Sequence, residues 1–336
     1  MIVNPCFQIG QVAESFTNPS TGHILDNWLI SRSDAAAATI SKDTDVPQDN
    51  VPSSLKIDIT TADASMAASD RFILEHRIEG NLWNQIRGKE GRISFWVKSN
   101  KIGYYYVAIQ NAGVDRELLL PYKINAADTW EKKVLTIPDV PTAGTWYTDE
   151  RIGAYLSFCL AAGTNFEGTV TNEWETITPS TYNYCASNQV NLLDSTSNEF
   201  FLTDVRVSVG TVLPTSPPKT FLEDQLECQR YYFKTYNYDT APGTASSTGL
   251  RAAAATGSGT KVDGAIAFPV PMRTSPTMTT YSTTSGTSGK VRDFTQSSDV
   301  TGIATAGEKS TYWGHADGTV SVGNDMRTHV VADARL

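Results

Sequence analysis

The chain has few of the residues that most metal and redox sites require. Its 336 residues include 4 cysteines and 4 histidines. The cysteines Cys6, Cys159, Cys185 and Cys228 lie far apart and form no CxxC pair, whereas disulfide frameworks and zinc knuckles need closer grouping. We therefore expect mostly free, buried thiols, since cysteine behaves as a small apolar residue. Cys159–Cys185 is the one pairing that merits a test.

Charge is also scarce, and cations are not clustered. Charged residues make up 19% of the chain, the net charge is −9, and no Lys/Arg run exceeds two residues. Residues 1–220 carry 25 acidic and 17 basic residues, a net of −8, and residues 221–336 carry 11 and 10, a net of −1. Binding to nucleic acids and to anionic membranes depends on clustered cations. The composition therefore argues against both partners.

Long apolar runs are missing as well. No stretch approaches the roughly 18 apolar residues of a membrane span, and the segment 1–7 lacks the basic start of a signal peptide. The sequence also contains no Gly-x-Ser-x-Gly, P-loop or Gly-x-Gly-x-x-Gly motif. We expect a protein made in a cytoplasm, without membrane insertion and without an enzymatic role.

What the first 210 residues do contain is short segments of alternating apolar and polar residues, joined by polar turns. Strands with one apolar face bury it by stacking on a second sheet. The pattern predicts an all-β jelly-roll sandwich over residues 1–210. The helix-prone stretch 34–39 is too short to stand alone. The predicted strands are 27–32, 54–60, 71–78, 91–98, 103–110, 130–137, 154–160 and 199–209.

A proline-rich linker is predicted at 211–219, because Pro214, Pro217 and Pro218 interrupt both strand and helix. Thr220 and Glu223 then form a Thr-x-x-Glu capping box, which predicts a helix of two to three turns from Phe221.

A smaller β-rich domain is predicted over 220–336. Its apolar residues come in short bursts separated by Ser/Thr/Gly-rich loops, which favours a domain that buries further surface by oligomerising. The predicted strands are 231–236, 262–268, 277–281, 289–294, 310–313 and 328–333.

Eight short segments stand out by their order and spacing along the chain. They are 27–28, 77–79, 88–98, 129–130, 136–138 and 198–205 in the first part, and 226–232 and 267–278 in the second. Together they resemble bacteriophage tail-fibre and virion appendage proteins that carry a carbohydrate-binding-type jelly roll. The last strand departs from the family pattern: it reads Val205-Arg-Val-Ser-Val-Gly210 where the family often has Val-Gln-Leu-Glu-x-Gly.

This resemblance implies a virion protein, assembled in the host cytoplasm, with a tail-fibre or surface-appendage position. It implies a homotrimer, other virion proteins and a host-surface glycan as partners, and no catalytic residues. Multivalency gives a physical reason for a trimer, because linked weak sites gain affinity through effective concentration.

Aromatic residues in polar surroundings are the candidate glycan contacts, since sugars stack their C–H faces on flat rings. Capping of sheet edges or packing at a subunit interface explains the same residues without a ligand. The candidates are Trp83, Trp146, Tyr147, Trp174, Tyr182, Tyr184 and Trp313.

Carboxylates give two further hypotheses. Asp43, Asp45 and Asp49 share a polar loop whose oxygens would suit a structural Ca²⁺. No other cofactor is expected. The neighbouring acids at 149–150 and at 173 and 175 would make a glycosidase pair only if they faced each other across a cleft; a solvated acidic loop is the simpler interpretation.

Three functions remain open on the sequence. A glycan-attachment protein is favoured, a purely structural tail or head component is the main alternative, and a polysaccharide depolymerase is the third.

Overall fold

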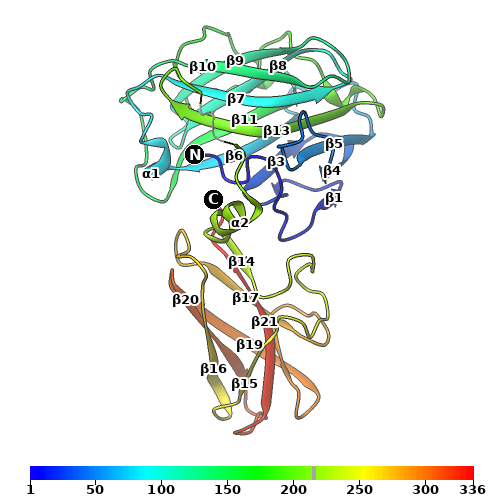
Figure 1. Cartoon of the computed structure of the whole chain (residues 1–336), viewed down its shortest axis with the longest axis vertical. Helices are drawn as coiled ribbons and strands as arrows, with labels where there is room; N and C mark the ends of the chain where they lie inside the picture. The colour runs from blue at the N-terminus through cyan, green and yellow to red at the C-terminus, as the bar shows by residue number, and fades with distance from the viewer. Residues whose placement is uncertain (214–216) are drawn as a thin grey trace. The chain divides into compact units, whose positions relative to one another are not determined.

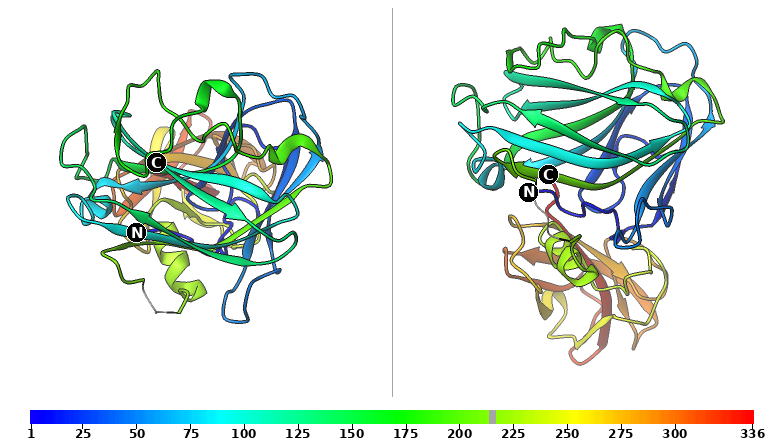
Figure 2. Two further views of the ribbon diagram at one scale, coloured as in Figure 1. Left: turned by 90° about the horizontal axis from the view of Figure 1, so that it is seen from above. Right: turned by 45° about the horizontal axis from the view of Figure 1, so that its top comes forward.

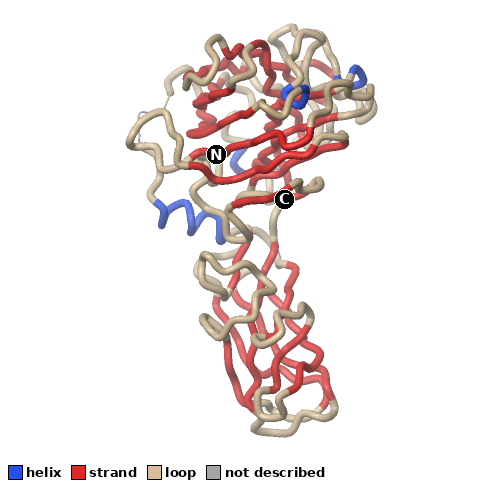
Figure 3. Tube along the Cα trace, turned by 90° about the vertical axis from the view of Figure 1, so that its right-hand side faces the viewer, coloured by secondary structure: helices blue, strands red, loops and turns tan. Residues whose placement is uncertain are grey.

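The computed structural model describes residues 1–213 and 217–336, so Pro214 of the predicted linker lies outside the described residues. The described chain divides into two compact units. Unit 1 comprises Met1–Ile9, Glu14–Phe221 and Leu336, and unit 2 comprises Gly10–Ala13 and Leu222–Arg335. Strands dominate both units, as Figure 3 shows. The protein is all-β, as the alternation of its sequence predicts.

Within its described residues, unit 1 forms a jelly-roll sandwich of two antiparallel sheets (Figures 1 and 2). Sheet 1 has the order β1-β4-β5-β13-β7-β10, and sheet 2 the order β12-β9-β8-β11-β6-β3-β2. The strands of sheet 1 are β1 (Ser15–Thr17), β4 (Ala37–Asp43), β5 (Ser54–Thr61), β7 (Gly91–Ser99), β10 (Glu131–Ile137) and β13 (Glu199–Val209). Those of sheet 2 are β2 (Gly22–His23), β3 (Trp28–Ser33), β6 (Arg71–Glu79), β8 (Gly103–Asn111), β9 (Arg116–Ile124), β11 (Ile152–Ala162) and β12 (Glu175–Thr176).

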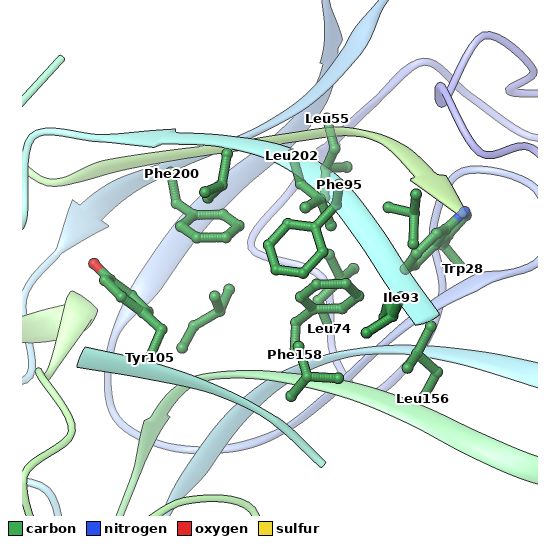
Figure 4. Close-up of a cluster of buried hydrophobic side chains, with 14 of the residues drawn as sticks. Trp28, Leu55, Leu74, Ile93, Phe95, Tyr105, Leu156, Phe158, Phe200 and Leu202 are labelled. Carbon is green, nitrogen blue, oxygen red and sulfur yellow. The ribbon is translucent and has the colours of Figure 1, made fainter. Parts of the chain in front are cut away.

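The core of unit 1 lies between the sheets and draws on alternate residues of each strand. Figure 4 shows side chains from both sheets meeting there. Phe95 of sheet 1 meets Phe158 of sheet 2 edge-on, with ring centroids 5.1 Å apart, and Phe200 contacts Tyr105 at 5.7 Å. Such geometry adds about 0.5–1.5 kcal/mol per pair to the gain from burial. The opposite face of each sheet is called its outer face below.

Five strands of unit 1, namely β1, β2, β4, β9 and β12, are absent from the sequence prediction, and β4 and β9 are the longest of them. The stretch 34–39, predicted to be too short for a helix, leads into a strand that was not predicted: Ala37 and Ala38 begin β4, where Ala38 is fully buried against the core. Burial by the neighbouring strand β5 overrides the helix preference of alanine. Strand β9 is absent from the sequence prediction, because Pro121 interrupts its apolar run. Strand β9 nevertheless pairs with β8 through the proline, and Pro121 lies opposite Tyr106 in the register.

Helices are short and few among the described residues. The helix predicted from Phe221 is confirmed as α2 (Phe221–Gln229). The others are α1 (Gly80–Trp83) and the 3-10 turns η1 (Thr164–Phe166) and η2 (Leu192–Asp194). No helix in the described part of the chain is long and apolar enough to cross a membrane.

Unit 2 is built on a sheet of order β14-β21-β18-β19-β20-β16, with β15 and β17 also paired to β21. Val291, Val330 and Met326 are among its fully buried core residues, and Phe233 packs on Phe268 at 5.4 Å. The strands are β14 (Tyr232–Lys234), β15 (Arg251–Ala254), β16 (Gly259–Ala267), β17 (Thr277–Ser282), β18 (Lys290–Asp293), β19 (Ser298–Ala306), β20 (Ser310–Asp317) and β21 (Asp325–Asp333).

Candidate functional site

Three of the predicted glycan-contact tryptophans form one packed cluster inside unit 1. Trp83 stacks on Trp146 with ring centroids 6.4 Å apart, and Trp146 meets Trp174 edge-on at 5.8 Å. Trp83 is 1% exposed and Trp146 8%. Helix α1 turns Trp83 inward because Gly80 and Gly153 let the two backbones approach closely: a Cβ on Gly153 would lie 2.6 Å from the Gly80 Cα. Burial therefore removes Trp83 and Trp146 as ligand platforms and leaves only the half-buried Trp174.

Trp313 is also buried, at 2% exposure in the core of unit 2. The indole lies under Gly264, where a Cβ would sit 2.6 Å from Trp313 Nε1. This ring supports the sheet and offers no face to a sugar.

Tyr182 and Tyr184 pack with Phe166, with ring centroids 5.5–5.7 Å apart. Tyr184 is 7% exposed and Tyr182 is half-buried. Tyr147 is half-buried and separate from both clusters: the Arg151 guanidinium covers its ring at 3.7 Å.

In the loop predicted to bind calcium, the Asp45 carboxylate is bonded to protein side chains. Asp45 Oδ1 accepts a hydrogen bond from Trp130 Nε1 at 2.8 Å, and its Oδ2 is in an ion pair with Lys98. No three His, Cys, Asp or Glu side chains within the described ranges gather as a metal cluster. The site predicted at Asp43, Asp45 and Asp49 therefore has no counterpart among these residues.

The strongest candidate site lies on the outer face of sheet 2. Strand register places Arg77, Tyr155, Gln110, Glu117 and Glu175 side by side across β6, β11, β8, β9 and β12. All five alternate with core residues, so they share the outer face. We call them the polar row. Its members come from five strands, so the backbone ladder fixes their spacing before any ligand binds.

The segment 163–190, here called the cover segment, lies against this face. Val190 N donates to the Tyr104 carbonyl of β8 at 3.0 Å, and Tyr106 OH donates to Asn188 Oδ1. Its two arms are joined where Tyr184 N donates to the Phe166 carbonyl at 2.9 Å. The segment therefore covers part of the sheet without entering it, except for β12.

Glu117 ties the cover segment to the polar row. Its Oε2 accepts from Asn183 N at 2.6 Å and from Gln110 Nε2 at 2.7 Å, and its Oε1 accepts from Asn183 Nδ2 at 2.9 Å. Burial raises the pKa of Glu117, and these donors oppose that rise. Because all three partners donate, the geometry is that of an ionised carboxylate.

A pocket of about 350 Å³ opens beside Glu117, between β9, β12 and the cover segment. Three glutamates contribute to its wall: Glu117, Glu173 and Glu175. Glu175 Oε1 accepts from Thr171 Oγ1 at 2.7 Å, and both Glu173 and Glu175 are exposed. The remaining lining residues are Leu119, Thr169, Thr171, Thr176, Ile177, Thr181 and Asn183. A wall of hydroxyl, amide and carboxylate groups suits a ligand rich in hydroxyl groups.

Only some of the acids proposed as a glycosidase pair lie at the pocket. Glu173 and Glu175 reach the pocket, whereas Asp149 is bound by Arg151, whose Nη2 lies 2.7 Å from Asp149 Oδ2. Glu117 would have to donate a proton to act as an acid, and its hydrogen bonds all run the other way. In this geometry Glu117 acts as a hydrogen-bond acceptor.

Sequence reasoning found Glu173 and Glu175 but missed the other residues that build this site. Tyr155, Gln110 and Asn183 belong to no motif, and Glu117 lies on β9, which the sequence pattern does not reveal as a strand. Strand register places Tyr155, Gln110 and Glu117 side by side, hydrogen bonds from the cover segment bring Asn183 to Glu117, and neither is visible in a single sequence.

No family model matches the chain, and no curated protein does. Solved structures with some likeness include a CBM4 structure (17% identity, 62% of this chain and 100% of that one, TM-score 0.33). A family 11 carbohydrate-binding module of a Clostridium thermocellum cellulase shows 13% identity over 61% of this chain and 99% of that one, with a TM-score of 0.31. The enzymatically active domain of tailspike protein 4 of bacteriophage CBA120 shows 13% identity over 60% of this chain, with a TM-score of 0.33. The match spans 21% of that tailspike chain.

Proposed function

We propose that this chain is a virion protein of tail-fibre or appendage type that attaches to host-surface glycans through the outer face of sheet 2. The observation that carries the glycan-binding part is the polar row, which ends in a pocket walled by glutamates and threonines. The ordered sequence resemblance supports the virion part. In this proposal the chain acts as a homotrimer beside other virion proteins.

The physical case rests on pre-organisation. Sugars present arrays of hydroxyl groups, and carboxylates accept from them through charge-assisted hydrogen bonds. Glu173 and Glu175 are exposed to accept them, while Glu117 is held in place by Asn183 and Gln110. A site fixed in advance loses little conformational entropy on binding.

A purely structural role is the second candidate, and one observation favours it. Trp83, Trp146, Tyr184 and Trp313 are buried within their own units, so most of the predicted sugar platforms serve packing. With most of the predicted aromatic platforms buried, affinity for a single sugar would be modest, and binding would depend on multivalency.

The test is binding of the purified full chain to a glycan array and to whole host cells. Glu173→Gln and Glu175→Gln keep side-chain size and remove charge in the pocket, and Glu308→Gln makes the same change at an exposed position of unit 2. We expect the pocket variants to lose roughly 10- to 100-fold in affinity, the value of one charge-assisted hydrogen bond, and the control to bind as the parent does. Absence of binding by the parent chain to both glycans and cells would leave the structural role. Release of shortened glycan would indicate a depolymerase.

A further inference from the structure

Two buried cysteines lie in one apolar cluster beneath the cover segment. Cys159 lies on β11, on the outer face of sheet 2, and Cys185 lies on the returning arm of the cover segment. Both belong to one small apolar cluster with Ile73, Tyr106 and Phe166, separate from the main core. Burial raises the pKa of the Cys159 thiol, and so does the neighbouring Cys185 thiol. Neither Cys159 nor Cys185 is disulfide-bonded in this structure.

The surroundings of Cys185 hold it in place opposite Cys159. Cys185 N and Sγ both donate to the Phe166 carbonyl, at 3.3 and 3.7 Å, and Gly168 N donates to the Cys185 carbonyl at 2.7 Å. These bonds clamp the two arms of the cover segment together at the Glu167–Cys185 bridge. Cys159 is fixed in turn by its register partners Ile73 and Tyr106 on the neighbouring strands.

We propose that Cys159 and Cys185 form a disulfide under oxidising conditions and that this bond latches the cover segment to the central strand of sheet 2. The consequence for ligand binding rests on the proposed function, because the same segment supplies Thr169, Glu173 and Asn183 to the pocket wall. The bond itself does not depend on that function.

The chemistry is thiol–disulfide exchange with a small disulfide such as oxidised glutathione. One cysteine thiolate attacks a glutathione sulfur, the glutathione S–S bond breaks and a first glutathione thiolate leaves. The second cysteine then attacks the mixed disulfide, forming the Cys159 Sγ–Cys185 Sγ bond and releasing a second glutathione. Two protein thiols are oxidised, one glutathione disulfide is reduced to two thiols, and the two thiol protons pass to the released glutathiones.

Access controls the rate of this reaction. Cys159 and Cys185 are 0% and 1% exposed, and burial raises the pKa of the Cys159 thiol. The cover segment must therefore open before either sulfur reacts, so the native thiols are slow to oxidise. Once formed, the bond joins positions 26 apart in the sequence, and it restricts the unfolded chain and the opened cover segment alike.

The experiment refolds the full chain in a redox buffer of reduced and oxidised glutathione, so that burial does not limit access. After quenching, denaturation and alkylation, we expect two alkylated thiols instead of four, and a crosslinked peptide pair from β11 and residues 182–190. The melting temperature of unit 1 should rise by roughly 5–10 °C, and amide exchange of residues 164–186 should slow. Dithiothreitol should reverse both changes.

Cys185→Ser and Cys159→Ala should each keep three alkylatable thiols. Neither variant should show the rise in melting temperature or the slower amide exchange of the cover segment. Four alkylatable thiols after oxidative refolding would overturn the proposal, as would a crosslink through Cys6 or Cys228. A disulfide without slower exchange of the cover segment would overturn the latch. None of these measurements uses a glycan, so their failure is distinct from loss of binding in the Glu173→Gln and Glu175→Gln variants.

Discussion

Glu117 and Asn183 are joined by two hydrogen bonds, from the Asn183 backbone N at 2.6 Å and from its Nδ2 at 2.9 Å. One partner lies on β9 and the other on the cover segment, 66 positions later. This contact makes one wall of the pocket depend on a single buried carboxylate, and it gives the first prediction.

Replacing Glu117 with Gln should loosen the cover segment. The glutamine amide group would present N–H donors to the donors of Asn183 and Gln110, and a buried unsatisfied polar group costs about 1–3 kcal/mol. Amide hydrogen exchange should quicken across 164–186 while β7 and β13 stay protected. Glu173→Gln, at an exposed position of the same pocket, is the matched control. Equal amide exchange rates in the two variants would show that the Glu117–Asn183 hydrogen bonds do not hold the cover segment in place.

Trp83 is predicted to act in folding and not in binding. Trp83→Ala should lower the free energy of unfolding of unit 1 by about 3–5 kcal/mol, because it empties a site stacked on Trp146. Tyr147→Ala, at a half-buried ring, should cost about 1 kcal/mol. Urea unfolding measures both. Near-equal losses would show that the tryptophan cluster does not support the sandwich.

Unit 1 should lose stability as the pH falls through the range of histidine titration. Burial lowers the pKa of His76 to about 3, while an unfolded histidine titrates near 6.5. The folded state therefore holds His76 neutral below pH 6.5, where the unfolded chain binds a proton. Stability is fully present above about pH 6.5 and falls by about 1.4 kcal/mol per pH unit below it.

The control for this pH effect is His76→Gln, which keeps a side-chain acceptor for Val3 N, now 3.2 Å from His76 Nε2. Its unfolding free energy should depend less on pH between about 5 and 6.5. The two proteins are compared by urea unfolding across that range, and parallel profiles would exclude His76 as the source.

The stability of unit 2 should depend on the buried, hydrogen-bonded pair of Asp263 and His315. The Nδ1 atom of His315 lies 2.7 Å from Asp263 Oδ2, and its Nε2 lies 3.1 Å from the Gly257 carbonyl. Removing Asp263 would leave a buried His315 nitrogen without its partner, which costs about 1–3 kcal/mol, so Asp263→Ala should lower the melting temperature of unit 2. Exchange of β16 and β20 reports on that unit, and Glu308→Ala serves as the exposed control. No loss of protection in β16 or β20 would contradict the role of the pair.

Much of the fold was predictable because the residues that set it are local. Ile93, Phe95 and Val97 hold alternate positions of the predicted strand 91–98, and all three are fully buried, as that alternation predicts. Proline positions and a capping box likewise predicted α2 at Phe221.

The site was less predictable because it depends on contacts between distant segments. Trp83 stands among polar residues in the sequence, yet α1 turns it into the core. Glu117 sits in an apolar run broken by Pro121, and its partner Asn183 lies in a loop without periodicity. Register across five strands creates the polar row, and no spacing rule within one segment reports it.

The most direct test of the central claim is the affinity of the full chain for host cells and arrayed glycans, compared between the parent, Glu173→Gln, Glu175→Gln and Glu308→Gln. We predict that the parent and Glu308→Gln bind alike and that the two pocket variants bind roughly 10- to 100-fold more weakly with unchanged melting temperatures. Equal binding by all four proteins would place the glycan contact elsewhere and contradict the assignment to the outer face of sheet 2.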